Sequence, residues 1–531
     1  MKIAHKLTVV ALLWLIFVNP GCITSFDTIY RLHMSHAWWT KTEESFSDAK
    51  LVVNIKGTKY IPYDLGQSML MLPGDWLGGQ LGKKLKNPLK RQFLREAVVS
   101  FFIFIPLNLL VVLSCWRFLR LLNYSEKVAA LSTLVLLIGT SVLFYSSYHQ
   151  QNNQILLFVL VGYQMALAYS LKGKKRLAIF SGMSSGIAFI IRITTVLHGV
   201  GVLIFLIGCA ISQARTQKLS NVTQSVLLWM SGFIPFILLE RILTYVRYDS
   251  WTATTASLHF RAISNAKNAL DPNTVVQEVD KGFSFLSLLT KAKPGMVLAP
   301  FLSPEKSVFL YDPILIPCLI LLFVCWRLMS RYHKWYVIAT TVSFFLHVYI
   351  YSWSSGWLKL QTWGARYHLT PLHLLLIPLI PLLVRGAIKQ IGKSKDILSK
   401  ILILSARVAI VLAICIQLSS VVIDSSVEAN QQRAGFGSRW RLIQRWQNIA
   451  ALSSGSIEYE VKPTRFKNPR SSLDLQRKIE AKNQWDLLPF IYKSRLDAVS
   501  TPDNWLPFLS AIWIVILFVA VASTVWLFMM G

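Results

Sequence analysis

Apolar residues along this chain gather into about twelve segments, each near the ~20 residues that an α-helix needs to cross a bilayer. Polar loops separate the segments, which lie roughly at 5–23, 97–116, 128–145, 155–171, 177–193, 195–212, 222–245, 312–328, 335–352, 367–384, 401–423 and 506–530. Residues 178–211 are almost continuously apolar, so they form either a pair of helices or one kinked helix. We favour the pair, with its break at Arg192, Thr194 and Thr195. The pattern predicts an all-α, polytopic integral membrane protein.

Positive charge is distributed unevenly between the two sides of these segments. The short loop at Lys172–Arg176 is strongly basic, whereas the loop at Tyr145–Gln154 contains no Lys or Arg. The positive-inside rule makes the basic side cytoplasmic, and with it the N-terminus. Long loops at 24–95, 246–311, 353–366 and 424–505 then lie on the non-cytoplasmic face. A basic patch from Lys83 to Arg95 lies on that face, where we expect it to contact lipid head groups.

The predicted organisation has three parts. Residues 1–423 form a transmembrane domain that includes the external loops 24–95, 246–311 and 353–366. Residues 424–505 lack a long apolar run and are expected to form a small, helical external region. Residues 506–531 form a C-terminal transmembrane helix.

Composition supports the membrane assignment and limits the classes of binding partner that we expect. Of 531 residues, 54% are hydrophobic and only 15% are charged, which leaves too little polar surface to cover a soluble globule. The net charge of +30 would suggest nucleic acid in a soluble protein. Here many basic residues are topological anchors and no aromatic platform for single strands accompanies the rest, so we expect membrane lipids and no nucleic acid as partners. The six cysteines show neither a disulfide framework nor metal-ligand spacing.

Asp27 is the first acidic residue and follows the first apolar segment directly. A carboxylate held at the bilayer surface can accept a proton from a hydroxyl group as a general base. An interfacial helix cap is an equally good interpretation. Further along the same loop, Tyr63, Asp64 and Gln67 precede an apolar stretch, as in a loop that returns to the membrane as an amphipathic helix. These three side chains could bind a sugar or only shape the loop.

Arg366 stands at the predicted external start of a helix, next to Tyr367 and close to several Trp residues. An external Arg runs against the positive-inside trend, and a planar guanidinium can bind a phosphate with two hydrogen bonds. Arg192 has a similar position at the outer end of another segment. His149, in the polar external turn, is a hydrogen-bonding candidate, although an isolated interfacial His is more often structural.

These residues occur in an order that resembles the GT-C membrane glycosyltransferases, in particular bacterial members similar to the family 39 protein mannosyltransferases and the aminoarabinose transferases. The resemblance covers roughly residues 1–385. It rests on the first-loop Asp27, on the stretch Tyr-Asp-Leu-Gly-Gln-Ser from Tyr63 running into Leu-Pro, and on an Arg after Gly-Ile-Ala-Phe-Ile-Ile. The stretch Ser303–Pro313 and the run Trp-Gly-Ala-Arg-Tyr from Trp363 complete it. Asp249 occupies a turn position where Gly is usual in such relatives.

The resemblance implies an inverting enzyme that transfers a sugar from a polyprenyl-phosphate donor to a glycan, lipid or protein acceptor. It also implies a bacterial inner (plasma) membrane, with the active site on its non-cytoplasmic face. Carried over, Asp27 would be the catalytic base and Arg366 a ligand of the donor phosphate, with Arg192 as a second. Tyr63, Asp64, Gln67, His149 and Tyr367 are candidates for substrate binding. Many relatives have Glu directly after the first-loop Asp, whereas Thr28 follows here. Glu43, Glu44 and Asp48 are therefore reserve candidates, in a setting typical of a solvated loop.

A phosphate leaving group departs readily once a cation balances its charge, so we expect no cofactor and leave a divalent metal open. Two other functions compete with a transferase. A transporter or flippase of lipid-linked saccharides would place ionisable groups along a path at bilayer depth, whereas here they cluster at segment ends. A non-catalytic scaffold of an envelope assembly would tolerate loss of Asp27.

Overall fold

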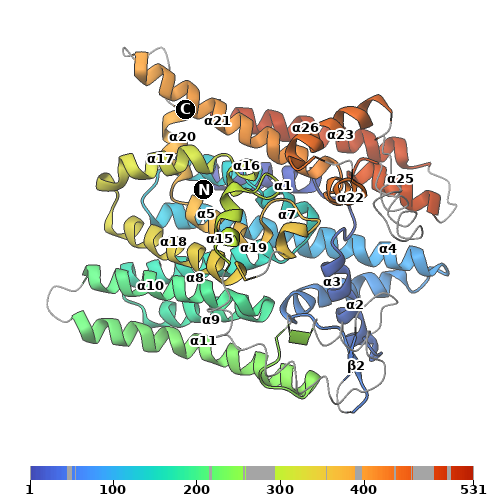
Figure 1. Ribbon diagram of the computed structural model, residues 1–531, viewed down its shortest axis with the longest axis horizontal. Helices are drawn as coiled ribbons and strands as arrows, with labels where there is room; N and C mark the ends of the chain where they lie inside the picture. Colours follow the sequence, from blue (N-terminus) through green and yellow to red (C-terminus); the bar gives the residue numbers. More distant parts are fainter. Residues whose placement is uncertain are drawn as a thin grey trace.

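The computed structural model describes residues 2–44, 51–53, 56–213, 218–254, 257–258, 293–353, 356–388, 397–435, 438–455, 457, 484–498 and 504–529. Within these ranges the chain is almost entirely helical, and the fold is the predicted polytopic all-α one (Figure 1). The one sheet in the described part is a two-stranded antiparallel pair, β1 (Val52–Val53) and β2 (Lys59–Tyr60). This pair belongs to the first long loop and lies outside the helical bundle.

Every apolar segment of the sequence corresponds to a helix or a pair of helices. In chain order these are α1 (Lys2–Phe17), α5 (Ile105–Leu121), α6 (Glu126–Ile138) with α7 (Val142–Tyr148), α8 (Asn152–Lys172), α9 (Lys175–Ile191), α10 (Val196–Gln213), α11 (Lys218–Tyr248), α17 (Leu315–Cys325), α18 (Arg331–Tyr351), α19 (Arg366–Leu376) with α20 (Ile380–Ala387), α21 (Ile397–Val422) and α26 (Leu506–Met529). The predicted break between the fifth and sixth segments is confirmed, because a short 3₁₀ turn, η2 (Ile193–Thr195), separates α9 from α10.

The helices differ more in length than the sequence pattern suggested. In the described part of the chain, six helices are long and apolar enough to cross a membrane, and eight if each bent pair counts as one span. The pairs α6–α7 and α19–α20 bend by 56° and 58°. The first helix ends at Phe17 instead of continuing to residue 23, because Pro20 disfavours helix before it and Gly21 has a left-handed φ of 68°.

Shorter helices surround the ends of the bundle. Figure 1 shows α2 (Phe26–Thr40), α3 (Gly66–Gly82) and β2 together on one side, close to α4 (Pro88–Val99). A π-helical turn, η1 (Ser100–Phe104), joins α4 to α5 without a break. The remaining short elements are α15 (Pro294–Leu302), α16 (Val308–Tyr311), η3 (Trp326–Leu328), η4 (Gly356–Lys359), α22 (Ser426–Ala434), α23 (Arg441–Ser454) and α25 (Leu488–Ala498).

The helices at two edges of the bundle, α9 with α11 and α1 with α26, pack closely against each other. A Cβ added to Gly182 of α9 would lie 2.0 Å from the Trp229 carbonyl oxygen of α11, so only glycine allows these two backbones to approach so closely. The C-terminal α26 packs on α1, where the Trp14 and Trp513 indoles donate hydrogen bonds to Thr524 and to the Phe17 carbonyl. In Figure 1, α9, α10 and α11 form one edge of the molecule and α21, α23 and α26 lie at the opposite edge.

The helix ends that we predicted to be external meet at one end of the bundle. Gln151, at the start of α8, donates a hydrogen bond to the Ile191 carbonyl at the end of α9. Asn152 donates another to the Arg366 carbonyl at the start of α19, and Thr28 of α2 donates one to the His149 carbonyl. These hydrogen bonds hold four separate parts of the chain next to one another, namely Thr28 of α2, the turn at 149–152, Ile191 and Arg366.

Candidate functional site

The carboxylate of Asp27 and the guanidinium of Arg366 form an ion pair across 339 positions of sequence. The distance from Asp27 Oδ2 to Arg366 Nη1 is 2.6 Å. The Arg366 side chain is 5% exposed, whereas that of Asp27 is 28% exposed. Asp27 is therefore the residue of the pair that is more accessible from outside the protein.

Local structure explains both positions. Asp27 lies in the first turn of α2, where the free N–H groups and the helix dipole favour a negative charge. Arg366 is the first residue of α19 and follows Gly364, whose φ of 56° turns the chain into the helix. The sequence predicted both residues as candidates, and the structure brings them into direct contact.

Tyr63 and Arg31 complete the surroundings of Asp27. The Tyr63 hydroxyl donates a hydrogen bond of 2.9 Å to Asp27 Oδ1, and the Arg31 guanidinium lies 4.4 Å from the centre of the Tyr63 ring. Arg31 also donates to the backbone carbonyl of Asp27, one helical turn earlier. We did not single out Arg31 from the sequence, although its spacing of four residues from Asp27 puts both on one face of a helix.

These contacts set the protonation of the carboxylate. Burial by itself would raise the pKa of Asp27, but the charges of Arg366 and Arg31 and the hydrogen bonds from Arg366 and Tyr63 outweigh it. The pKa of Asp27 is therefore well below its usual value. Burial, followed by the charge of Asp27, raises the pKa of Tyr63, so its hydroxyl remains a donor. In this state Asp27 is a charged, weakly basic carboxylate.

Arg192 and Tyr367 lie on the other side of Arg366. The guanidiniums of Arg192 and Arg366 are 4.6 and 5.6 Å from the centre of the same Tyr367 ring. Tyr367 stacks on Tyr351 at 4.4 Å with the planes almost parallel, and the Tyr351 hydroxyl donates to Thr194. Arg192 is partly exposed, and no carboxylate pairs with it among the described residues. The site thus holds three cations: Arg366, which is paired with Asp27, Arg31 near the same carboxylate, and Arg192, which pairs with no carboxylate of the described residues.

Two buried N–H groups of this cluster have no acceptor in the described part of the chain. They are the Nε–H groups of Arg31 and Arg366, both buried. Leaving a buried donor unpaired costs about 1–3 kcal/mol, and more for a charged group. An anionic group placed against these guanidiniums would satisfy such donors.

The other substrate-binding candidates have different surroundings. Gln67 and His149 are fully buried, and Gln67 Nε2 donates to the His149 carbonyl at 2.8 Å. Ser100 Oγ lies 3.1 Å from His149 Nε2, and burial lowers the pKa of His149 to about 3. Asp64 lines a small recess shared with Arg247 and Tyr248. For Gln67 and His149 the contacts match the shape-holding alternative, and their role in binding stays a prediction.

The reserve acids do not share one environment. Glu43 is exposed, and Asp48 lies outside the described residues. Glu44 is buried and forms a 2.6 Å ion pair with Arg247, while it also accepts hydrogen bonds from Trp38 and from the Ile61 amide. The expected solvated setting was therefore wrong for Glu44, which ties the first loop to the end of α11. Asp249, next to that helix end, has a left-handed φ of 54°, as a position that usually holds Gly would require.

The region after α21 covers part of this end of the bundle. Asp424 and Asp486, which come from this region, are buried acids. Arg445 of α23 is fully buried, 3.3 Å from Glu428 and 5.4 Å from the centre of the Trp363 ring. These residues carried no recognisable motif in the sequence. Among the described residues, no group of three or more His, Cys, Asp or Glu side chains is placed to hold a metal ion.

Comparison with known proteins gives few relatives. No family model matches the chain, and neither does any curated protein. Among solved structures, the chain is similar to the arabinosyltransferase EmbB from Mycobacterium smegmatis, with 12% sequence identity and a TM-score of 0.40. The alignment covers 82% of this chain and 43% of that chain, so this chain spans less than half the length of EmbB. The function proposed below is argued from the residues of the chain itself.

Proposed function

We propose that this chain is a membrane glycosyltransferase that moves a sugar from a polyprenyl-phosphate donor to an acceptor hydroxyl on the non-cytoplasmic face. The observation that carries the proposal is the ion pair between Asp27 and Arg366, with the unpaired cation Arg192 beside it. A base and two phosphate ligands are what a transfer from a sugar phosphate requires. They lie together where a lipid head group is expected to reach them.

In the proposed reaction, the acceptor oxygen attacks the anomeric carbon as its proton passes to Asp27. The bond from that carbon to the phosphate oxygen breaks with inversion, and the lipid phosphate leaves with the electron pair. Arg366 and Arg192 balance the charge on the departing phosphate, which is the electrostatic contribution that the reaction needs. Base assistance of this kind typically contributes 10²- to 10⁴-fold to the rate.

The ion pair also suggests how donor binding prepares the base. While Arg366 is paired with Asp27, the carboxylate is a poor proton acceptor because its pKa is held low. A donor phosphate would compete for the Arg366 guanidinium, and the pKa of Asp27 would then rise because Arg31 and Tyr63 alone compensate its burial less. The base would become effective only when the donor is in place, which would limit unproductive reaction with water.

Mass spectrometry of lipid-linked sugars and envelope glycans from cells lacking the chain tests this function. We expect a polyprenyl-phosphate sugar to accumulate and one glycosylated product to disappear. Complementation with the wild type should restore the product, whereas Asp27→Asn protein present at normal levels in the membrane should not. Restoration by Asp27→Asn would favour the scaffold or the flippase, because neither function needs the carboxylate as a base.

A further inference from the structure

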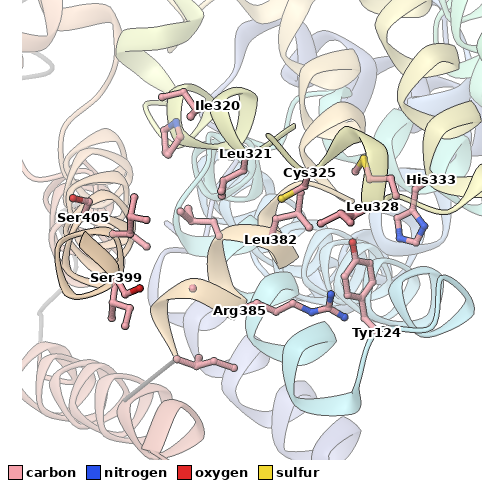
Figure 2. Close-up of a pocket in the computed structure, with 18 of the residues that line it drawn as sticks. Tyr124, Ile320, Leu321, Cys325, Leu328, His333, Leu382, Arg385, Ser399 and Ser405 are labelled. Atoms are coloured by element: carbon pink, nitrogen blue, oxygen red, sulfur yellow. The ribbon is translucent and has the colours of Figure 1, made fainter. Parts of the chain in front are cut away.

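A second cavity lies at the opposite end of the helices, away from Asp27. It has a volume of about 1170 Å³ and lies between α17, α20 and α21, next to the start of α18. Figure 2 shows Tyr124, His333 and Arg385 at one end, Ser399 and Ser405 on the far wall, and Leu321, Leu328 and Leu382 between them. The basic loops that we predict to be cytoplasmic connect the helices at this end.

The walls of this cavity are mostly apolar. Side chains from three helices supply them, namely Pro317, Ile320, Leu321, Leu382, Leu383, Leu402, Ile403 and Ala406. Cavities for small molecules usually measure about 300–1,000 Å³, so this one is larger than most and suits a ligand with long hydrocarbon chains. Ile320 and Leu402 are well exposed on the helix surfaces, where the cavity opens toward the hydrocarbon of a bilayer.

The polar end of the cavity presents one cation, the exposed Arg385. The Arg385 guanidinium lies 4.7 Å from the centre of the Tyr124 ring, and the described residues provide no acceptor for its N–H groups. Its neighbours are already engaged, since the Tyr124 hydroxyl donates to the Pro378 carbonyl and His333 Nδ1 lies 2.7 Å from Ser330 Oγ. Arg385 therefore remains available to an anion from outside the chain.

We infer that this cavity binds an anionic phospholipid of the cytoplasmic leaflet, with its phosphate on Arg385 and its acyl chains along α17, α20 and α21. A guanidinium binds a phosphate with charge-assisted, two-pronged hydrogen bonds. Basic pockets between transmembrane helices on the cytoplasmic side are suited to lipid head groups. The exposed Arg327 and Arg331 beside the opening add positive charge that favours an anionic over a zwitterionic head group.

Native mass spectrometry of the purified, delipidated full-length protein tests this inference, with phosphatidylglycerol and phosphatidylcholine as the added lipids. Wild-type protein should retain one phosphatidylglycerol preferentially. Arg385→Gln should weaken its retention about tenfold, as expected for the loss of a charge-assisted contact. Gly386→Leu keeps every charge but places a bulky side chain in the cavity beside Arg385, because a Cβ at Gly386 meets only the Ala406 methyl at 3.9 Å, and it should also weaken retention of the lipid.

The matched control is Arg176→Gln, which removes an exposed Arg at the basic start of α9, away from the residues that line the cavity. It should leave retention of phosphatidylglycerol unchanged. Equal losses in Arg176→Gln and Arg385→Gln would mean that only general surface charge attracts the lipid and would overturn the inference. Equal retention of both lipids by the wild type, or full retention by Gly386→Leu, would do the same.

Discussion

At the scale of single residues, the account depends on a carboxylate that is more constrained than its sequence position suggests. A residue just beyond the first membrane helix is expected to be well solvated, and its substitution is expected to change the free energy of unfolding little. Asp27 is instead the counter-charge of a guanidinium that is 5% exposed. Its replacement therefore affects Arg366 as well as any reaction that Asp27 carries out.

Asp27→Asn should lower the stability of the protein, contrary to what its surface position would predict. Arg366 would keep a neutral acceptor but lose its counter-charge, at a cost of about 2 kcal/mol, within the range for an unsatisfied buried group. Thermal unfolding of the purified protein would measure the loss. The double variant Asp27→Asn with Arg366→Gln should recover part of it, because the two changes act on one interaction. Additive losses would show that the pair contributes little.

The same ion pair predicts how stability depends on pH. The pKa of Asp27 is lowered in the folded protein, so its contribution is fully present above the unfolded value of about 4. It is lost as the pH falls through the folded value. The difference in melting temperature between wild type and Asp27→Asn should therefore be constant above about pH 5 and shrink as the solution is acidified further. A difference that grows on acidification would contradict the low pKa.

At the scale of elements, one glycine controls how the first loop meets the bundle. A Cβ on Gly66, at the start of α3, would lie 2.5 Å from the backbone nitrogen of Ile191, the residue before Arg192. Any side chain at this position must push α3 away from the end of α9. The spacing between Asp27 and Arg192 thus depends on a residue that touches neither.

Gly66→Ala should reduce both stability and donor binding. Overpacking of this kind typically costs about 1–3 kcal/mol, and the displaced α9 end would move Arg192 from the Tyr367 ring. Gly295→Ala is the matched control, because nothing lies within 4 Å of its Cβ and it should leave both properties unchanged. Thermal unfolding and lipid-phosphate binding of both variants would test this. If Gly66→Ala matched the wild type in stability and in lipid-phosphate binding, the backbones of α3 and α9 could move apart without affecting either property.

Hydrophobic patterning predicted the positions of the helices because burial in a bilayer demands long apolar runs. It could not predict the bends at α6–α7 and α19–α20, which are tertiary features. Asp27 and Arg366 stood out because each is a charge at an unusual place in the pattern. The partners Arg31, Glu44 and Arg445 did not, since each is an ordinary charged residue until folding brings its counterpart within reach.

At the scale of the whole molecule, the two ends of the bundle differ in chemistry. Asp27, Arg192 and Arg366 lie at the end that the loop charges predict to be external, and Arg385 lies at the other end. Both proposals therefore depend on the predicted orientation. A donor lipid and a structural phospholipid would occupy separate sites in opposite leaflets.

Cysteine labelling in intact cells would establish this orientation. A cysteine at Lys174, in the α8–α9 loop, should react with a membrane-impermeant reagent only after the cells are opened. A cysteine at the exposed Ser454, at the end of α23, should react from outside. Labelling of both positions from the same side would contradict the topology and remove the external site.

The most direct test of the central claim is the dissociation constant of purified protein for a polyprenyl phosphate, compared among Asp27→Asn, Arg192→Gln, Arg366→Gln and wild type. If Asp27 and a lipid phosphate compete for Arg366, Asp27→Asn should bind more tightly than wild type. Arg192→Gln and Arg366→Gln should each bind about tenfold more weakly. Unchanged or weaker binding by Asp27→Asn, with both Arg variants at the wild-type level, would show that the ion pair is only structural.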